Sequence, residues 1–308
     1  MFMVEAQLPI RVGSALDLFH SCSKHAIDCH KYLMSSKFTR NVVISRVKDK
    51  KGKIVKVFEC ISIRNGIERK TPVNQELFIW NHSELEEFNK SFIAEIKVNN
   101  GKGCSSFSSL SKFDVNQFNK YIYTLAMSFS ILKKIQTPGD KKVAGSFLEY
   151  LAECLICLAI GKRIQTSKYK EFIDGNELSI NLDMWYRKKN SQIIGMPVKL
   201  STRERNTQLF FHHFLLSRCE SLLKKPSPIT IPLICNEYNA GKVNKPKEAF
   251  VNETCIPGTW RTYNTLVPLH GVVCYLDIPR DYDPTPKGCP EFITWGDFFF
   301  NRIDRYFQ

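Results

Sequence analysis

The sequence lacks the features that mark membrane, secreted and low-complexity proteins. It has no uninterrupted apolar run of about 18 residues, the length that spans a bilayer as a helix. Its longest apolar stretch, residues 151–160, is interrupted by Glu153. The first residues carry Glu5 and no basic segment followed by an apolar one, so no secretory signal is expected. The sequence therefore predicts a soluble protein of a reducing cytoplasm.

Cysteine usage does not indicate a disulfide framework. The chain has 11 cysteines, an odd number without regular spacing, so most are expected to be reduced thiols. Cys22, His25 and Cys29 share one face of a predicted helix. A structural zinc site usually draws a second pair of ligands from another element, and no such pair is evident. We therefore expect a partly buried helix here rather than zinc.

Acidic residues are scarce relative to basic ones. Lys and Arg number 44 and Asp and Glu 30, which gives a formal net charge of +14. This balance makes a polyanion the first candidate partner. Nucleic acid is favoured over a membrane because no strongly basic amphipathic helix lies next to an apolar anchor. The alternative is a basic surface without a functional partner.

The first third of the chain predicts an accessory region. Residues 15–34 have helical spacing, and the alternating segments 42–47 and 54–63 flank the turn sequence 49–52, which predicts a β-hairpin. The Gly- and Ser-rich segment 101–109 predicts a loop. The chain has 308 residues, of which 43% are hydrophobic, enough to bury a full core. We divide it into an accessory region at 1–110 and a core at 111–308.

Residues 143–235 of the core have the predicted order helix, strand, strand, helix, strand. A helix at 119–135 is followed by a second that ends at Gly161. Further helical and strand patterns follow toward the carboxy terminus. The predicted ranges are a helix at 143–160, strands at 177–187 and 191–200 joined by a turn at 188–190, a helix at 203–223, strands at 229–235 and 267–275, and a packing helix at 292–307.

Two residues on the predicted hairpin suggest phosphodiester chemistry. Asp183 lies on the first strand and Lys199, sixteen residues later, near the end of the next. A hairpin can bring the two to one sheet edge. A carboxylate there can hold a divalent cation that lowers the pKa of a bound water, and a lysine can help to deprotonate that water. Glu149, on the preceding helix, can supply a further carboxylate. This set of residues predicts a metal-dependent nuclease.

The pattern resembles a known family over residues 140–236. Glu149, Asp183 and the run VKLSTRER at 198–205 resemble the PD-(D/E)xK nuclease superfamily. More narrowly, they are similar to type II restriction endonucleases with a Lys-x-x-x-Arg-Glu-Arg motif, the group that cuts CCGG, CCNGG or CCWGG. The residues that match this motif are Lys199, Arg203, Glu204 and Arg205.

The resemblance implies a fold and an activity. The expected fold is α/β and restriction-endonuclease-like, with a central mixed sheet flanked by helices. Residues 111–308 are expected to form the nuclease core and a carboxy-terminal extension. Residues 1–110 are expected to contact DNA. The expected activity is Mg²⁺-dependent hydrolysis of double-stranded DNA at a short palindrome, giving 5′-phosphate ends. Asp183 and Glu149 would hold Mg²⁺, and Lys199 would assist the attacking water. A homodimer paired with a cognate DNA methyltransferase in the bacterial cytoplasm is expected.

The residues after Lys199 are suited to reading bases. An arginine can donate two hydrogen bonds to guanine O6 and N7, and a glutamate can accept one from cytosine N4. Arg203 and Glu204 are therefore predicted to read a G:C pair. Arg205 and Gln208 are predicted to add a base or phosphate contact.

The sequence departs from the family pattern at two places. Pro197 stands where the commonest form has an acid two residues before the lysine, and His212 and His213 stand where relatives have an acid farther on. The second carboxylate then comes from Glu149 or, as alternatives, from Glu153 or Glu220. Otherwise Asp183, the Val198 carbonyl and waters hold the metal without a second carboxylate. Two other functions stay open: a structure-specific or repair endonuclease, and a non-catalytic DNA-binding protein on a degenerate nuclease fold.

Overall fold

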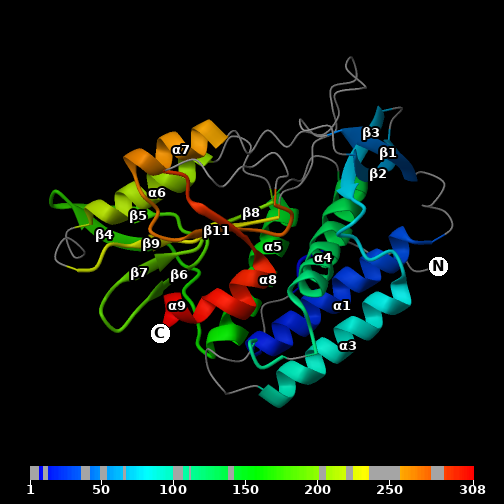
Figure 1. The fold of residues 1–308 in the computed structure, drawn as a ribbon, viewed down its shortest axis with the longest axis horizontal. Coiled ribbons are helices and arrows are strands. Elements are labelled where there is room, and N and C mark those ends of the chain that lie inside the picture. Colours follow the sequence, from blue (N-terminus) through cyan, green and yellow to red (C-terminus); the bar gives the residue numbers. More distant parts are fainter. Residues whose placement is uncertain are drawn as a thin grey trace.

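The computed structural model shows the predicted α/β class, with helices packed against a central mixed sheet (Figure 1). It describes residues 7–9, 13–35, 42–48, 54–64, 67–99, 107–110, 112–137, 142–200, 206–219, 225–235, 257–278 and 288–308. Residues 101–106 of the predicted loop at 101–109 lie outside these ranges, as do residues 236–256.

The central sheet is built from short strands in two ladders. One ladder has the order β12-β11-β10-β8 and is parallel throughout. The other has the order β6-β7-β9, in which β6 is antiparallel to β7 and β7 is parallel to β9. The strands are β6 (Trp185–Arg187), β7 (Ile193–Gly195), β8 (Val198–Lys199), β9 (Ile229–Thr230), β10 (Leu233–Ile234), β11 (Val272–Tyr275) and β12 (Glu291–Thr294).

Proline explains why two predicted strands are each divided. The predicted strand at 191–200 contains Pro197 between β7 and β8, and that at 229–235 contains Pro232 between β9 and β10. Proline has no N–H to donate to a ladder. Backbone hydrogen bonds nevertheless continue across the gap, from Ile231 N to Gly195 O at 2.9 Å and from Leu233 N to Pro197 O at 2.8 Å. The two ladders are therefore parts of one continuous sheet.

The predicted strand at 177–187 is wrong as a single element. Its first part is β5 (Asn176–Ile180), which pairs with β4 (Tyr169–Ile173) in a separate antiparallel hairpin. The two-residue turn of that hairpin is Asp174 and Gly175, both with positive φ (50° and 73°), as a tight hairpin turn requires. The chain then bends before β6 begins, and Asp183 lies in this bend.

The helical layer confirms the predicted amino-terminal and central helices. The helix α1 (Ala15–Leu33) packs against α4 (Val115–Gln136) and α5 (Lys142–Ile160), and it also contacts α3 (His82–Asn99). Ser14 and Asp17 form a capping box at the start of α1. Gly161 follows α5 with φ of 63°, the left-handed cap that the sequence predicts. In Figure 1 these helices lie on one side of the central sheet.

The helix α5 is the most apolar element of the described chain. By length and composition alone it is long and apolar enough to cross a membrane, but 61% of its most apolar window is buried inside the protein. Phe147 on α5 stacks on Phe129 of α4, with ring centroids 4.0 Å apart and planes 7° from parallel. These contacts identify α5 as a core helix.

A small antiparallel sheet confirms the predicted amino-terminal hairpin. The strands β1 (Val42–Lys48) and β2 (Ile54–Arg64) pair as expected, and an unpredicted third strand, β3 (Ile67–Asn74), pairs with β2. The predicted turn at 49–52 lies outside the described residues. Next to this sheet, the apolar side chains of α1 join those of α4, α5 and the central sheet in one hydrophobic cluster.

The carboxy-terminal third differs most from the prediction. The helix α6 (Asn206–Arg218) ends before the end of the predicted helix at 203–223, whose first three residues lie outside the described ranges, and α7 (Pro257–Leu266) was not predicted. The strand β11 begins five residues later than the predicted strand at 267–275. The predicted helix at 292–307 is instead the strand β12 followed by three short helical segments. These are α8 (Trp295–Asp297), the π-helical turn η3 (Phe298–Arg302) and α9 (Ile303–Phe307).

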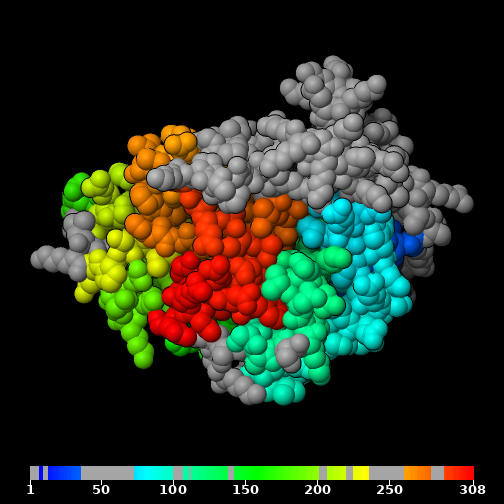
Figure 2. Space-filling model, viewed as in Figure 1, coloured from blue at the N-terminus to red at the C-terminus, as the bar shows by residue number. Residues whose placement is uncertain are grey.

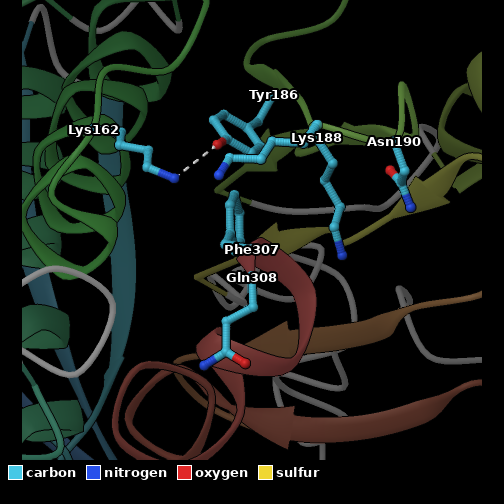
Figure 3. A pocket seen from close by; sticks show the side chains of 7 residues that line it. Lys162, Tyr186, Lys188, Asn190, Phe307 and Gln308 are labelled. Carbon is cyan, nitrogen blue, oxygen red and sulfur yellow. Dashed lines mark hydrogen bonds between the residues drawn. The ribbon is translucent and has the colours of Figure 1, made fainter.

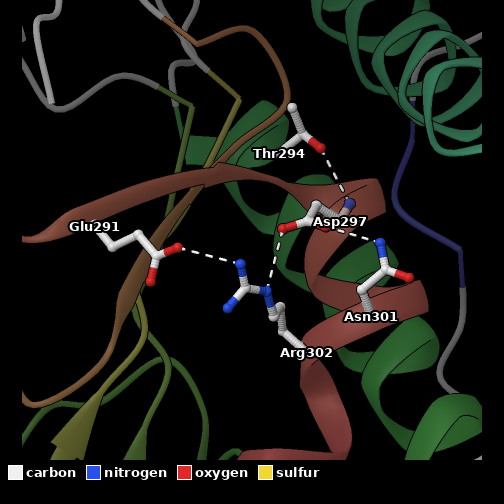
Figure 4. Close-up of polar contacts among 5 residues, drawn as sticks. All are labelled: Glu291, Thr294, Asp297, Asn301 and Arg302. Atoms are coloured by element: carbon white, nitrogen blue, oxygen red, sulfur yellow. Dashed lines mark hydrogen bonds and ion pairs between the residues drawn. The ribbon is translucent and has the colours of Figure 1, made fainter.

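A polar cluster explains why the last segment turns from strand to helix (Figure 4). Thr294 caps α8 by accepting a hydrogen bond from Asp297 N at 3.0 Å. Arg302 contacts Glu291 at 3.3 Å and Asp297 at 3.6 Å, which ties the helical turns back to β12. Gly296 lies so close to Val115 that a Cβ there would come within 2.5 Å of the Val115 carbonyl oxygen. On the face shown in Figure 2, this red segment lies beside the blue-green residues around α4.

We predict that the stacked pair Phe129 and Phe147 is essential for stability. Phe147 is fully buried, so Phe147→Ala leaves a cavity and is expected to lower the free energy of unfolding by about 3–5 kcal/mol. Phe172, which is 50% exposed on β4, is the matched control, and Phe172→Ala is expected to cost less than about 1 kcal/mol. Urea unfolding measures both. Equal losses in the two variants would contradict the assignment of α5 as the core helix.

Candidate active site

Asp183 and Lys199 form a partly buried ion pair at one edge of the central sheet. Lys199 Nζ donates to Asp183 Oδ2 at 2.5 Å, and Val198 N donates to the same oxygen at 2.8 Å. The side chains are only 10% (Lys199) and 17% (Asp183) exposed, so water screens the pair less than a surface pair. Among the described residues, no hydrogen bond involves Asp183 Oδ1. That oxygen is therefore available to a ligand.

The strand order brings these two residues together. Lys199 is the last residue of β8, at the carboxyl end of the parallel ladder, where its carbonyl accepts from Cys235 N at 3.0 Å. β6 runs antiparallel to β7, so the beginning of β6 lies beside the end of the β7–β8 strand. Met196 N donates to Met184 O at 2.8 Å, which places Asp183 next to Val198. The structure thus brings the predicted pair together, although Asp183 precedes β6 and is not on a strand.

His212 lies within electrostatic reach of the pair. Burial lowers the pKa of this half-buried imidazole first, the positive charge of Lys199 lowers it further, and the negative charge of Asp183 opposes both. The next residue, His213, is buried, and its Nδ1 lies 2.8 Å from Thr230 Oγ1 on β9. Burial lowers the pKa of His213 to about 4. This contact holds α6 on the sheet and so positions His212.

Glu149 and Glu153 lie on α5, which packs against β8. Both are half-buried. Across the residues that the structure describes, no group of three or more His, Cys, Asp or Glu side chains is close enough to hold a metal ion. Neither Cys22, His25 and Cys29 on α1 nor the residues around Asp183 form such a group. The role of Glu149 stays a prediction.

The predicted base-reading residues fall mostly outside the described part of the chain. Arg203, Glu204 and Arg205 precede α6 and lie outside it, as does Glu220 after α6. Gln208 lies in the first turn of α6 and is exposed.

Sequence reasoning missed Asp277, a buried acid near the same edge. It follows β11, where Leu276 N donates to Ile234 O at 2.8 Å, and it is 4% exposed. Asn74 at the end of β3 donates from Nδ2 to Asp277 Oδ2 at 2.9 Å. Because β8, β10 and β11 are parallel, Asp277 lies two strands from Lys199 at the carboxyl edge. The acid that ends the apolar run at 272–276 was the signal available in the sequence.

Comparison with known proteins gives a structural match without a sequence match. No family model and no curated protein matches the chain. Its structure is similar to the crystal structure of the type IIP restriction endonuclease Kpn2I, with a TM-score of 0.69 and 19% identity. The match covers 95% of this chain and 96% of that chain. The chain therefore has a restriction-endonuclease-like α/β fold, as the sequence predicted, and the fold includes the accessory region.

We predict that His212 reports the charges of the pair. Lys199→Met removes a positive charge and should raise the pKa of His212, whereas Asp183→Asn removes a negative charge and should lower it. Titration of the imidazole proton signals by NMR, assigned with His212→Gln, measures both shifts. Lys170→Met, on the surface of β4, is the control and should leave the titration unchanged. Shifts of the opposite sign would contradict this arrangement.

Proposed function

We propose that the protein is a type II restriction endonuclease that hydrolyses double-stranded DNA at a short palindromic site containing G:C pairs, with Mg²⁺ as cofactor. The observation that carries the proposal is the Asp183–Lys199 pair at the carboxyl edge of the central sheet. The similarity in fold to a restriction endonuclease supports it. The net charge of +14 suits a DNA substrate.

The residues at this edge fit a Mg²⁺ site of the kind completed by substrate. Mg²⁺ is usually bound by one or two carboxylates together with waters and phosphate oxygens of the substrate. Asp183 Oδ1 is available for this role, and Glu149 on α5 is the proposed second carboxylate. The Val198 carbonyl is a further candidate oxygen. When bound, the ion supplies charge neutralisation at the phosphate and a lowered pKa for a bound water.

The chain's own residues account for the remaining steps. The ammonium of Lys199 is held by Asp183, which orients it for the attacking water and the scissile phosphate. Water oxygen bonds to phosphorus in line with the leaving group as the bond from phosphorus to O3′ breaks. The water gives up one proton and O3′ takes one up, so the strand ends become a 5′-phosphate and a 3′-hydroxyl. Asp183 keeps the lysine in place because an ion pair of low exposure resists separation by solvent.

Recognition of DNA is proposed to come from two parts of the chain. Arg203, Glu204, Arg205 and Gln208 are the proposed base and phosphate contacts. The strands β1 to β3 are proposed to contact the DNA backbone. Their charged residues are mostly basic, namely Arg46, Lys48, Lys56, Arg64, Arg69 and Lys70 against Glu59 and Glu68.

The buried hydrogen bond from Asn74 to Asp277 links β3 to the edge that carries Lys199. A palindromic site further implies a two-fold homodimer, and cleavage of DNA in a cell implies a cognate methyltransferase that protects the host sites.

We predict Mg²⁺-dependent, site-specific cleavage that requires the ion pair. Unmethylated phage DNA incubated with the purified protein should give discrete bands with Mg²⁺ and none with a chelator. Asp183→Asn and Lys199→Ala should each lower the cleavage rate by at least about 10²-fold. The surface pair Lys170 and Glu177 is the matched control, since its side chains are 67% and 58% exposed. Lys170→Ala and Glu177→Gln should leave the rate unchanged.

Three other results would change the assignment. Cleavage that follows junctions or lesions rather than a short sequence would indicate a structure-specific or repair endonuclease. Binding without cleavage over a range of divalent metals would indicate a non-catalytic DNA-binding protein, in which Pro197 and His212 replace acids that the activity needs. Cleavage that survives Asp183→Asn would show that another carboxylate carries the chemistry.

A second prediction identifies the other carboxylate on α5. If Glu149 helps to hold Mg²⁺, Glu149→Gln should raise the Mg²⁺ concentration for half-maximal cleavage by about tenfold or more, while Glu153→Gln, one turn away, should change it little. Cleavage rates measured across a Mg²⁺ titration test this. The reverse order of effects would assign the role to Glu153.

A further inference from the structure

A cavity lined by lysines and aromatic rings lies apart from the Asp183–Lys199 pair (Figure 3). Its volume is about 420 Å³, within the range of small-molecule sites. Three parts of the chain meet there: the segment after α5, the turn between β6 and β7, and the end of α9. The lining residues are Lys162, Tyr186, Lys188, Lys189, Asn190, Phe307 and Gln308.

The charged side chains that line this cavity are all basic. Of the described residues that line it, Lys162, Lys188 and Lys189 are basic and no side chain is acidic. Within the described chain, none of these lysines forms an ion pair. Like charges gathered around one hollow repel one another and create a positive potential. An anion in the cavity would remove that repulsion.

The turn that carries two of the lysines is held in place by hydrogen bonds. Lys188 N donates to Gln192 O and Ser191 N to Lys188 O, each at 2.9 Å. Gln192 N donates to Asn190 Oδ1 at 3.1 Å, and Gln192 Nε2 donates to Ser227 O at 2.8 Å on the approach to β9. The lysines therefore project from an ordered turn, which lowers the entropic cost of binding a ligand.

Two aromatic rings form an apolar wall beside the lysines. Tyr186 on β6 and Phe307 on α9 contact each other with ring centroids 5.4 Å apart. Lys162 Nζ lies 3.4 Å from the Tyr186 hydroxyl, which anchors the ammonium at the cavity while leaving N–H groups to donate. Figure 3 shows the amino group of Lys162 pointing toward the Tyr186 hydroxyl, with the ring of Phe307 below that of Tyr186. A ligand with an anionic group and an apolar body suits this combination.

The cavity and the ion pair lie at opposite ends of β6. Asp183 lies in the bend before the strand and Lys188 follows the strand, whose three residues alone span about 10 Å at the usual rise of about 3.3 Å per residue. A phosphate held beside Lys199 would therefore not be the one that the cavity holds.

We propose that this cavity is a second phosphate site, which binds a phosphate monoester of mononucleotide size. The lysines take the phosphate, whose two negative charges match their excess, and the wall of Tyr186 and Phe307 takes the apolar body of the ligand. The inference goes beyond the proposed nuclease function and does not depend on it.

Calorimetric titration with adenosine 5′-monophosphate tests the proposal. The wild-type protein should bind this probe with a Kd below about 1 mM, and adenosine at least about tenfold more weakly. The double variant Lys162→Gln, Lys188→Gln should weaken binding of the nucleotide by at least about tenfold, and Lys170→Gln, a surface control on β4, should not. Asp183→Asn should abolish cleavage and leave nucleotide binding intact, which separates this proposal from the proposed nuclease function.

A competing duplex distinguishes the source of the phosphate. If a saturating duplex oligonucleotide without free phosphate ends leaves nucleotide binding unchanged, the site takes a free phosphate monoester. If the duplex displaces the nucleotide and this depends on Lys162 and Lys188, the site takes a phosphate of the DNA backbone, and the monoester proposal is wrong. No binding at millimolar nucleotide, equal binding of adenosine, or equal binding by the double variant would also overturn it.

Discussion

The hydrogen-bonded ladder between the β7–β8 and β9–β10 strands is the constraint on which the candidate site depends. Proline interrupts each strand, yet the bonds from Ile231 to Gly195 and from Leu233 to Pro197 keep both in register. That register decides that Lys199 ends its strand at the carboxyl edge. The antiparallel pairing of β6 with β7 then brings Asp183 to Val198 and Lys199. Open α/β sheets commonly place their ligands at such an edge, so the ladder determines where the chemistry can occur.

The electrostatics of that edge set this chain apart from the family pattern it resembles. Pro197 and His212 occupy positions where an acid is expected, so Asp183 is the carboxylate that contacts Lys199 directly. Burial and then the positive charge of Lys199 lower the pKa of His212, and the negative charge of Asp183 opposes both.

The accessory region is part of the same folded body. α1 shares its hydrophobic cluster with α4, α5 and the central sheet, and Asn74 at the end of β3 is hydrogen-bonded to the buried Asp277. His30 on α1 lies 2.8 Å from the Ile79 carbonyl, which holds the segment after β3 against that helix. The Asn74 contact connects β3 to the sheet edge that carries Lys199.

Local patterns in the sequence determined the α/β class, the helices α1, α4 and α5, and the β1–β2 hairpin. Apolar spacing, capping residues and turn residues depend only on residues that are close in sequence, so they can be recognised without the tertiary structure. The tertiary structure alone decided the features that depend on distant partners. The close approach of Gly296 to Val115 and the ion pair of Arg302 with Glu291 belong to the helical turns that replace the predicted last helix. The Asp174–Gly175 turn, by contrast, is a local signal of the β4–β5 hairpin that the prediction missed. The contact of Asn74 with Asp277, separated by about two hundred residues, has no local signature, because only folding brings the two together.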